Sequence, residues 1–351
     1  MKNTLTLIPT VSIYPDKIIL YNKAHWSPNK PSKHQYITGI TDTEVVYEHL
    51  LQSKRKADGY LSKTAVRKMS RAIEYLLYLA SPKKIQERLS GKIVNFKVAF
   101  VTLTLSSKQV HTDKEIREKL LNQFLIEIKK KYKVKNYVWR AEKQKNGNIH
   151  FHILVDKFIH YSELRDTWNR IQNKLGYVEA YRRELKEWHK EGFRIRQELT
   201  GKWSADSQYK AWLNAKKTDY HNPNSTDIHS LKNIKNVKSY IQKYMSKEAE
   251  INSEMTKEQI EKLMVEGRLW GCNQELSSVR GAITEIDNQL SDEILKVTTD
   301  KKVHQFHDTY FDIFFISIQE VIKRGLLHLY ELFRAYCREH FHLPENYKFA
   351  F

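Results

Sequence analysis

The chain has 351 residues, of which 40% are hydrophobic and 29% charged, a balance typical of globular proteins with room for two or three compact units. Sixty Lys and Arg against 41 Asp and Glu give a net charge of +19, which favours nucleic acid or an anionic membrane surface as a partner. Two cysteines without a CxxC pair exclude a zinc ribbon and a disulfide framework, and no apolar segment is long enough to cross a membrane.

The abundance of aromatic residues favours nucleic acid over a membrane. The chain has 20 Tyr and seven Trp, whose rings can stack on unpaired bases. A Lys-rich composition by itself is also what an AT-rich genome produces. The N-terminus lacks a signal-peptide pattern, so we expect a cytoplasmic location.

Residues 1–92 are expected to form an N-terminal accessory region. The first 55 residues alternate short apolar segments with turn signals and predict strands and turns. From Leu61 to Ala80 the apolar residues recur at helical spacing, and Ser81-Pro82 would end that helix.

Residues 93–250 are expected to form the central domain, with a helical insertion at 182–222. Apolar periodicity and turn residues predict these elements in chain order: a buried strand at 93–105, an amphipathic helix at 113–131, strands at 136–143 and 148–155, a helix at 161–175, a strand at 226–231 and a helix at 234–249. Residues 251–351 are expected to be a helical C-terminal region, with helices at 255–266 and 304–342. The chain is therefore predicted to be α+β, with a central antiparallel sheet flanked by helices.

Two histidines on the strand at 148–155 are candidate metal ligands. Side chains alternate along a strand, so His150 and His152 share one face while Phe151 points to the other. Two imidazoles one pleat apart can bind one divalent ion. The alternative is two polar residues on a solvent-exposed face.

The turn before this strand decides whether Glu142 is a third ligand. A three-residue loop with left-handed Gly147 places Glu142 opposite His150, on the same face. A two-residue turn at Asn146-Gly147 places Lys143 there instead and turns Glu142 away. A carboxylate beside two imidazoles would suit Mn²⁺ or Mg²⁺. For Glu142 the alternative is a surface ion pair.

The predicted helix at 234–249 carries two tyrosines one turn apart. Tyr240 and Tyr244 stack on one face, at the edge of the helix's apolar stripe. Lys243 and Lys247 lie on the adjacent polar side and could hold a phosphate. The alternative is a boundary helix with solvated lysines and tyrosines. A second basic segment, 127–145, carries eight Lys and Arg against two Glu and includes the candidate DNA contacts Lys143 and Lys145.

Three ordered segments together resemble the motifs of HUH rolling-circle replication initiators. They are Phe100–Leu105, His150-Phe151-His152 and Tyr240-x-x-Lys243-Tyr244-x-x-Lys247. The tyrosine pair is similar to that of initiators from small single-stranded DNA phages and related plasmids. Glu142, eight residues before the first histidine, matches a common position for a third metal ligand. The resemblance covers roughly residues 95–250.

The resemblance implies a metal-dependent nickase with a tyrosine nucleophile. A divalent ion, Mn²⁺ or Mg²⁺, would polarise the scissile phosphate of single-stranded or hairpin origin DNA. A tyrosine would attack and stay bound to the 5′ phosphate, and the freed 3′ hydroxyl would prime rolling-circle replication. No P-loop occurs, so no helicase motor is expected within the chain. The resemblance also implies a bacterial host cell, whose helicase and polymerase are candidate partners.

Other functions stay open at this point. A relaxase or a transposase would use the same chemistry. A non-catalytic basic nucleic-acid-binding protein would tolerate Phe at both tyrosine positions, and an RNA-binding module would not cleave DNA.

Overall fold

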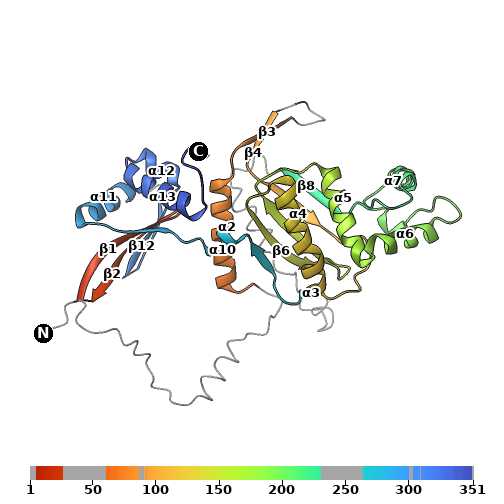
Figure 1. Cartoon of the computed structure of the whole chain (residues 1–351), viewed down its shortest axis with the longest axis horizontal. Helices are drawn as coiled ribbons and strands as arrows, with labels where there is room; N and C mark the ends of the chain where they lie inside the picture. The colour runs from red at the N-terminus through yellow and green to blue at the C-terminus, as the bar shows by residue number, and fades with distance from the viewer. Residues whose placement is uncertain are drawn as a thin grey trace, which may run out of the picture. The chain divides into compact units, whose positions relative to one another are not determined.

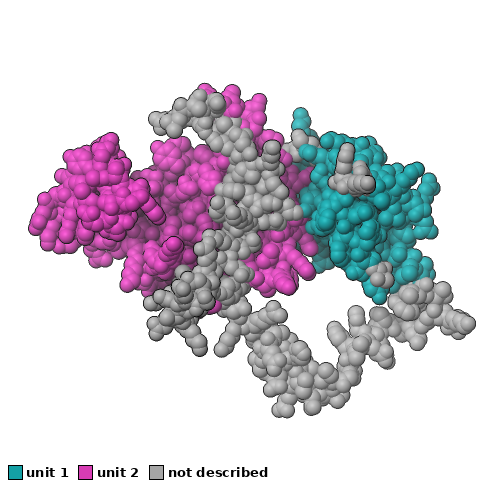
Figure 2. All heavy atoms as spheres, turned by 180° about the vertical axis from the view of Figure 1, so that it is seen from behind, with its two compact units in different colours: residues 1–56, 274–351 teal, residues 57–273 magenta. Residues whose placement is uncertain are grey.

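A computed structural model describes residues 5–26, 61–86, 91, 93–230, 264–299, 303–308 and 310–349. The chain divides into two compact units (Figure 2), which we describe separately. Unit 1 combines residues 1–56 with 274–351, and unit 2 holds residues 57–273. The three regions predicted from the sequence have their boundaries after residues 92 and 250 instead. Within the described ranges, no helix combines the length and the apolar character that a membrane crossing needs.

Unit 2 is built on a five-stranded antiparallel sheet of order β8-β5-β7-β6-β9. Its strands are β5 (Ala99–Leu103), β6 (Tyr137–Lys143), β7 (Ile149–Val155), β8 (Thr226–Ser230) and β9 (Trp270–Cys272). The two predicted strands around Asn146-Gly147 and the short strand near 226–231 are therefore confirmed. The predicted α+β class with antiparallel sheets and flanking helices is also confirmed.

The strand predicted at 93–105 is wrong as a single element. It is divided into β4 (Ile93–Phe96) and β5, with a bend at Lys97 between them. β4 pairs with β3 (Lys83–Gln86) in a separate two-stranded sheet. The ammonium of Lys83 donates to the Lys97 carbonyl over 3.1 Å, so β3 holds the chain at the bend.

One face of the unit 2 sheet forms the core against helices. The predicted helix at 113–131 is confirmed as α3 (Asp113–Ile116), a π-helical turn (Arg117–Leu121) and α4 (Asn122–Tyr132). The predicted helix at 161–175 is α5 (Tyr161–Gln172), followed by a 3₁₀ turn. Buried side chains of these helices pack with those on the inward face of β7, namely Ile149, Phe151 and Ile153. The opposite face of β7 is therefore left to His150 and His152.

The remaining helices of unit 2 flank this core. α2 (Lys63–Leu79) confirms the helix predicted from Leu61 to Ala80 and packs against β6 and β9. The insertion at 182–222 is helical in two parts, α6 (Tyr177–Trp188) and α7 (Ala205–Lys217), with a loop between them. Figure 1 shows α6 and α7 at one end of unit 2, beyond α5.

Unit 1 is a second five-stranded antiparallel sheet, of order β10-β1-β2-β12-β11. Its strands are β1 (Leu5–Ile13), β2 (Ile18–Trp26), β10 (Ala282–Glu285), β11 (His304–His307) and β12 (Phe311–Phe315). Its helices are α10 (Gln274–Ser278), α11 (Asn288–Thr298), α12 (Ile318–Lys323) and α13 (Leu327–His340).

The C-terminal region therefore contains both strands and helices, whereas the sequence predicted helices alone. The helix predicted across 304–342 is wrong over its first part, because 304–307 and 311–315 form a hairpin whose second strand pairs with β2. That partner lies almost 300 residues away in the sequence, so local periodicity does not reveal it. Most of the helix predicted at 255–266 lies outside the described residues, and residues 264–266 are irregular.

Candidate metal centre and catalytic site

The hairpin between β6 and β7 has the three-residue loop that brings Glu142 to the histidines. Gly147 is left-handed at a φ of +83°, and its amide donates to the Gln144 carbonyl over 2.8 Å. The Gln144 amide donates to the Asn148 carbonyl, also over 2.8 Å, which closes the loop. Glu142 is the register partner of His150, so the two-residue turn is excluded.

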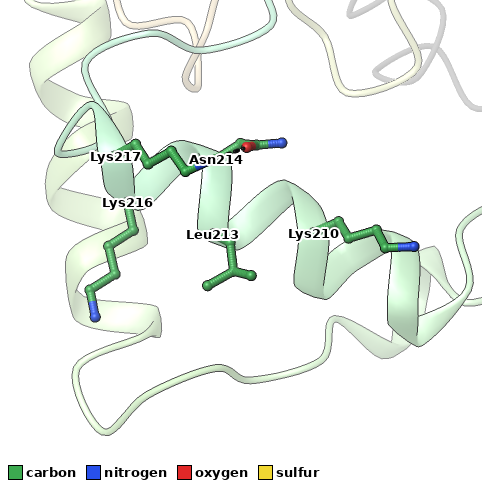
Figure 3. A pocket seen from close by; sticks show the side chains of 5 residues that line it. All are labelled: Lys210, Leu213, Asn214, Lys216 and Lys217. Atoms are coloured by element: carbon green, nitrogen blue, oxygen red, sulfur yellow. Dashed lines mark hydrogen bonds between the residues drawn. The ribbon is translucent and has the colours of Figure 1, made fainter.

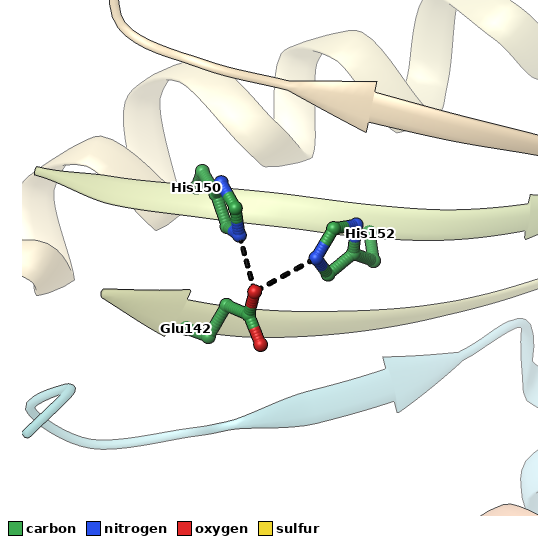
Figure 4. A group of neighbouring side chains, drawn as sticks. All are labelled: Glu142, His150 and His152. Atoms are coloured by element: carbon green, nitrogen blue, oxygen red, sulfur yellow. Dashed lines mark hydrogen bonds and ion pairs between the residues drawn. The ribbon is translucent and has the colours of Figure 1, made fainter. Parts of the chain in front are cut away.

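Glu142, His150 and His152 converge on the face of the sheet opposite the core (Figure 4). Oε1 of Glu142 lies 2.6 Å from Nε2 of His150 and 2.9 Å from Nε2 of His152. The side chains of the two histidines are 13% and 12% exposed and that of Glu142 is 29% exposed, so the cluster is largely shielded but open to a ligand.

The cluster holds its carboxylate ionised. Burial raises the pKa of Glu142, but hydrogen bonds and charge interactions with the two histidines outweigh burial and leave the pKa well below its ordinary value. A negatively charged oxygen therefore faces two imidazole nitrogens at neutral pH.

Thr102 on β5 orients one of the ligands. It is the register partner of His152, and its Oγ1 lies 3.2 Å from Nδ1 of that ring. In a metal-bound state a proton on Nδ1 would be donated to Thr102, and the lone pair of Nε2 would face the ion instead of a proton being shared with Glu142. Thr102 lies within the Phe100–Leu105 motif, but nothing in the sequence identified it as a partner of His152.

Two further residues of this face were not predicted. Arg140, 6% exposed, is the register partner of His152 and lies two residues before Glu142 on β6. Phe100 has its ring centroid 5.2 Å from that of His152. Strand alternation could have placed both residues on the face of Glu142 once the sheet order was known.

The three side chains fit a divalent metal ion. Their ligand atoms, two imidazole nitrogens and one carboxylate oxygen, all lie within 4.8 Å of one another. Imidazole suits several transition metals, and carboxylate suits Mg²⁺ and Mn²⁺, so the donor set does not select one ion. The Nδ1 contact to Thr102 adds the outer hydrogen bond that ligating histidines usually have.

The two lysines predicted as DNA contacts at this hairpin lie in different environments. Lys143 donates to Oδ1 of Asp113 over 2.6 Å, and the two side chains are only 10% and 5% exposed. Asp113 also accepts from the Gln109 side chain and the Glu266 amide. Lys143 therefore ties the hairpin to the start of α3, which favours a structural role. Lys145 lies in the turn and is exposed.

The other predicted catalytic and DNA-binding residues lie outside the described residues. These are Tyr240, Lys243, Tyr244 and Lys247. The described residues therefore include the three candidate metal ligands on β6 and β7 but not the two candidate tyrosine nucleophiles.

Comparison with known proteins gives a match to a family model. Searches of curated proteins and of solved structures gave no match. Residues 98–249 match the family model of the ORF2-type replication-associated proteins. That segment contains Glu142, His150 and His152, as well as the predicted tyrosine helix. The match does not establish the two-tyrosine subtype. The match to residues 98–249 agrees with the resemblance to rolling-circle replication initiators.

Proposed function

We propose that the protein nicks and rejoins single-stranded origin DNA through a 5′-phosphotyrosine linkage, and so starts rolling-circle replication. The observation that carries the proposal is the convergence of Glu142, His150 and His152 on one sheet face, within the segment that matches a replication-associated family model. Their arrangement supports binding of a divalent ion next to a DNA phosphate. A family match alone would leave catalysis open.

In the proposed reaction one phosphodiester bond is exchanged for another. A tyrosine oxygen, Tyr240 or Tyr244, bonds to the scissile phosphorus as its proton is lost. The bond from phosphorus to the 3′ oxygen breaks, and that oxygen takes up a proton and leaves as a free 3′ hydroxyl. The 5′ phosphate stays on the tyrosine, and attack by a 3′ hydroxyl reverses the exchange and rejoins the strand.

The residues of the cluster would position the phosphate for this exchange. Glu142, His150 and His152 would hold the ion, while Thr102 fixes the ring of His152. A bound divalent ion would stabilise the charge that develops on the phosphate oxygens. An unperturbed tyrosine has a pKa of about 10, so its oxygen needs such help to attack at neutral pH.

The chain length after β8 supports tyrosines as the nucleophiles. β8 ends at Ser230, level with Val155 and at the end of the sheet away from the hairpin. The two histidines lie three and five residues back along β7, about 10 and 16 Å away. In the helix that the sequence predicts from Ile234, Tyr240 and Tyr244 lie about 9 and 15 Å from the start. A helix returning over this face would carry both hydroxyls to the level of the histidines.

Lysines would supply the remaining charge. Lys243 lies between the two tyrosines in the sequence and could stabilise the phosphate for either, and Lys247 and Lys145 could hold neighbouring phosphates. A host polymerase would extend the strand from the 3′ hydroxyl, and a host helicase would separate the strands ahead of it.

The test is a nicking assay on a panel of single-stranded origin oligonucleotides labelled at the 3′ end. We expect a protein–DNA adduct that carries the 3′ label, forms with Mn²⁺ or Mg²⁺ and is absent in excess EDTA. DNA binding without any adduct under all metal conditions would favour a non-catalytic DNA-binding protein and overturn the proposal.

A further inference from the structure

The helical insertion of unit 2 has a small core of its own. Aromatic rings from α7 and the loops on either side of it pack together: Phe193 and Tyr209 have centroids 5.1 Å apart, and Phe193 and Trp212 5.6 Å apart. His189 is stacked with Phe193 and with Tyr220. These contacts hold α7 as a rigid helix rather than as a loose loop.

The acidic residues of the insertion are largely paired with its cations. Asp219 accepts from both Arg182 and Lys186, and Glu184 pairs with Arg196. By contrast, Lys202, Lys216 and Lys217 have no carboxylate partner among the residues that the structure describes. Their charges are therefore not neutralised within the insertion.

Two of these cations, Lys216 and Lys217, lie beside apolar side chains that are exposed on α7. Lys210, Leu213, Asn214 and Lys217 follow one another at helical spacing and, together with Lys216, line a hollow of about 390 Å³ (Figure 3). Leu213 is 39% exposed, and its neighbour one turn back, Tyr209, is 43% exposed. Lys210 pairs with Asp206, but both side chains are about 70% exposed, so this pair holds the lysine weakly.

Helix stability accounts for only part of this pattern. Lys216 and Lys217 lie in the last turn of α7, where cations complement the partial negative charge of the helix end. That effect gives no reason for Tyr209 and Leu213 to be exposed between lysines. An exposed aromatic ring beside ammonium groups that are held only by exposed or uncharged partners is the arrangement that binds unpaired nucleotides, because the ring stacks on a base and the lysines contact phosphates.

We infer that the α7 face formed by Tyr209, Lys210, Leu213, Lys216 and Lys217 binds single-stranded DNA flanking the cleaved site. The inference rests on the proposed function for its substrate. In Figure 1, α7 lies beyond α5, whereas the Glu142–His150–His152 cluster is on β6 and β7. The two sites are thus on different elements of unit 2, and α7 acts on a distal part of the strand, not on the reacting phosphate.

The experiment compares wild type with the variant Lys210→Gln/Lys216→Gln/Lys217→Gln, which removes the three cations of this face. Binding of oligo(dT) strands of about 10 and about 40 nucleotides is measured by fluorescence anisotropy, since one single-strand site covers roughly 4–16 nucleotides. We expect the variant to bind the long strand about tenfold more weakly. Its slope of log affinity against log salt should fall by about two, because each single-strand phosphate contact contributes about 0.7. The short strand should bind equally to both proteins, because the sheet face around Glu142, His150 and His152 can bind it and is the same in both.

The matched control is Lys296→Gln/Lys323→Gln/Lys348→Gln, which removes the same charge from exposed lysines of unit 1. We expect this control to bind the long strand nearly as wild type does. Equal weakening by both triple variants would show a general charge effect, and wild-type affinity of the α7 variant would show that α7 makes no contact. Either result overturns the inference.

The variant Tyr209→Leu distinguishes stacking of the Tyr209 ring on a base from contacts with the DNA backbone alone. Leucine keeps apolar contact with Phe193 and Trp212, so the insertion should stay folded, and circular dichroism checks this. We expect weaker binding of the long single strand and unchanged binding of a duplex of equal length. Unchanged single-strand binding, with duplex binding lowered by the lysine variant, would reassign α7 to duplex DNA and contradict the inference. These assays need no cleavage, so they can fail independently of the proposed nicking activity.

Discussion

Each unit contains a hairpin that pairs a histidine with an acid across two strands, but only one of them forms a metal-ligand cluster. In unit 1, His307 contacts its register partner Asp312. In unit 2, His150 contacts its register partner Glu142. The difference is the second histidine. His152 is two residues from His150 and shares its face, whereas His304 is three residues from His307 and points to the opposite face.

Exposure and charge separate the units in the same way. The side chain of His307 is 55% exposed, about four times as much as that of His150. Unit 2 carries 43 Lys and Arg against 25 Asp and Glu, whereas unit 1 carries 17 against 16. The excess positive charge therefore belongs almost entirely to the unit that carries the Glu142 cluster. Spacing along a strand and the surrounding charge, more than the presence of a histidine–acid pair, mark a candidate site for DNA chemistry.

The largest expected effect comes from removing the hydroxyls of Tyr240 and Tyr244, because no residue of unit 1 is predicted to act as a nucleophile. The double variant Tyr240→Phe/Tyr244→Phe should form no covalent adduct, because no hydroxyl is left to attack. Each single variant should retain single-turnover nicking and lose repeated cleavage and rejoining. Peptide mapping of the adduct and a strand-transfer assay measure both. If one tyrosine carries all the adduct and the other tolerates Phe with full strand transfer, the second tyrosine is structural.

Next in size is the loss of a metal ligand. Glu142→Ala, His150→Ala or His152→Ala should each reduce cleavage by about a thousandfold, corresponding to roughly 4 kcal/mol of transition-state stabilisation. DNA affinity should stay close to that of wild type, since binding depends on distributed lysines. The matched variant His307→Ala in unit 1 should cleave normally. Wild-type cleavage by the His150→Ala protein in excess EDTA would contradict the metal assignment.

A structural effect is expected at the ion pair beside the cluster. Asp113→Ala removes the acceptor of Lys143, Gln109 and the Glu266 amide, and leaves a mostly buried ammonium without its carboxylate. The free energy of unfolding should fall by about 3–5 kcal/mol, measured by urea denaturation. Lys143→Met should cost less, because Asp113 keeps two donors. If Lys143→Met instead lowers DNA affinity with unchanged stability, Lys143 contacts DNA.

The smallest expected effect is at Thr102. Thr102→Val keeps the shape of the side chain but removes the hydrogen bond to Nδ1 of His152. Metal affinity should fall by about 10–100-fold, with little change in stability. Thr102→Ser should restore the affinity, and titration of the metal by calorimetry compares the three proteins. Equal metal affinity in all of them would show that Thr102 does not position the ligand.

The sequence by itself determined the local half of the candidate site. Strand alternation placed His150 and His152 on one face, and the turn residues limited Glu142 to two registers, of which the structure adopts the one opposite His150. The amphipathic helix at 113–132 was equally predictable, because its buried residues recur every three or four positions. These features depend on residues within one hairpin or one helix, so spacing is enough to predict them.

Only the tertiary structure decided the features that depend on distant pairing. Thr102 reaches His152 because β5 lies beside β7, although the two residues are 50 positions apart. Residues 311–315 form a strand because β2, near the other end of the chain, offers them a ladder of hydrogen bonds. A short apolar segment is compatible with either helix or strand, and the partner that satisfies its backbone groups determines which one forms.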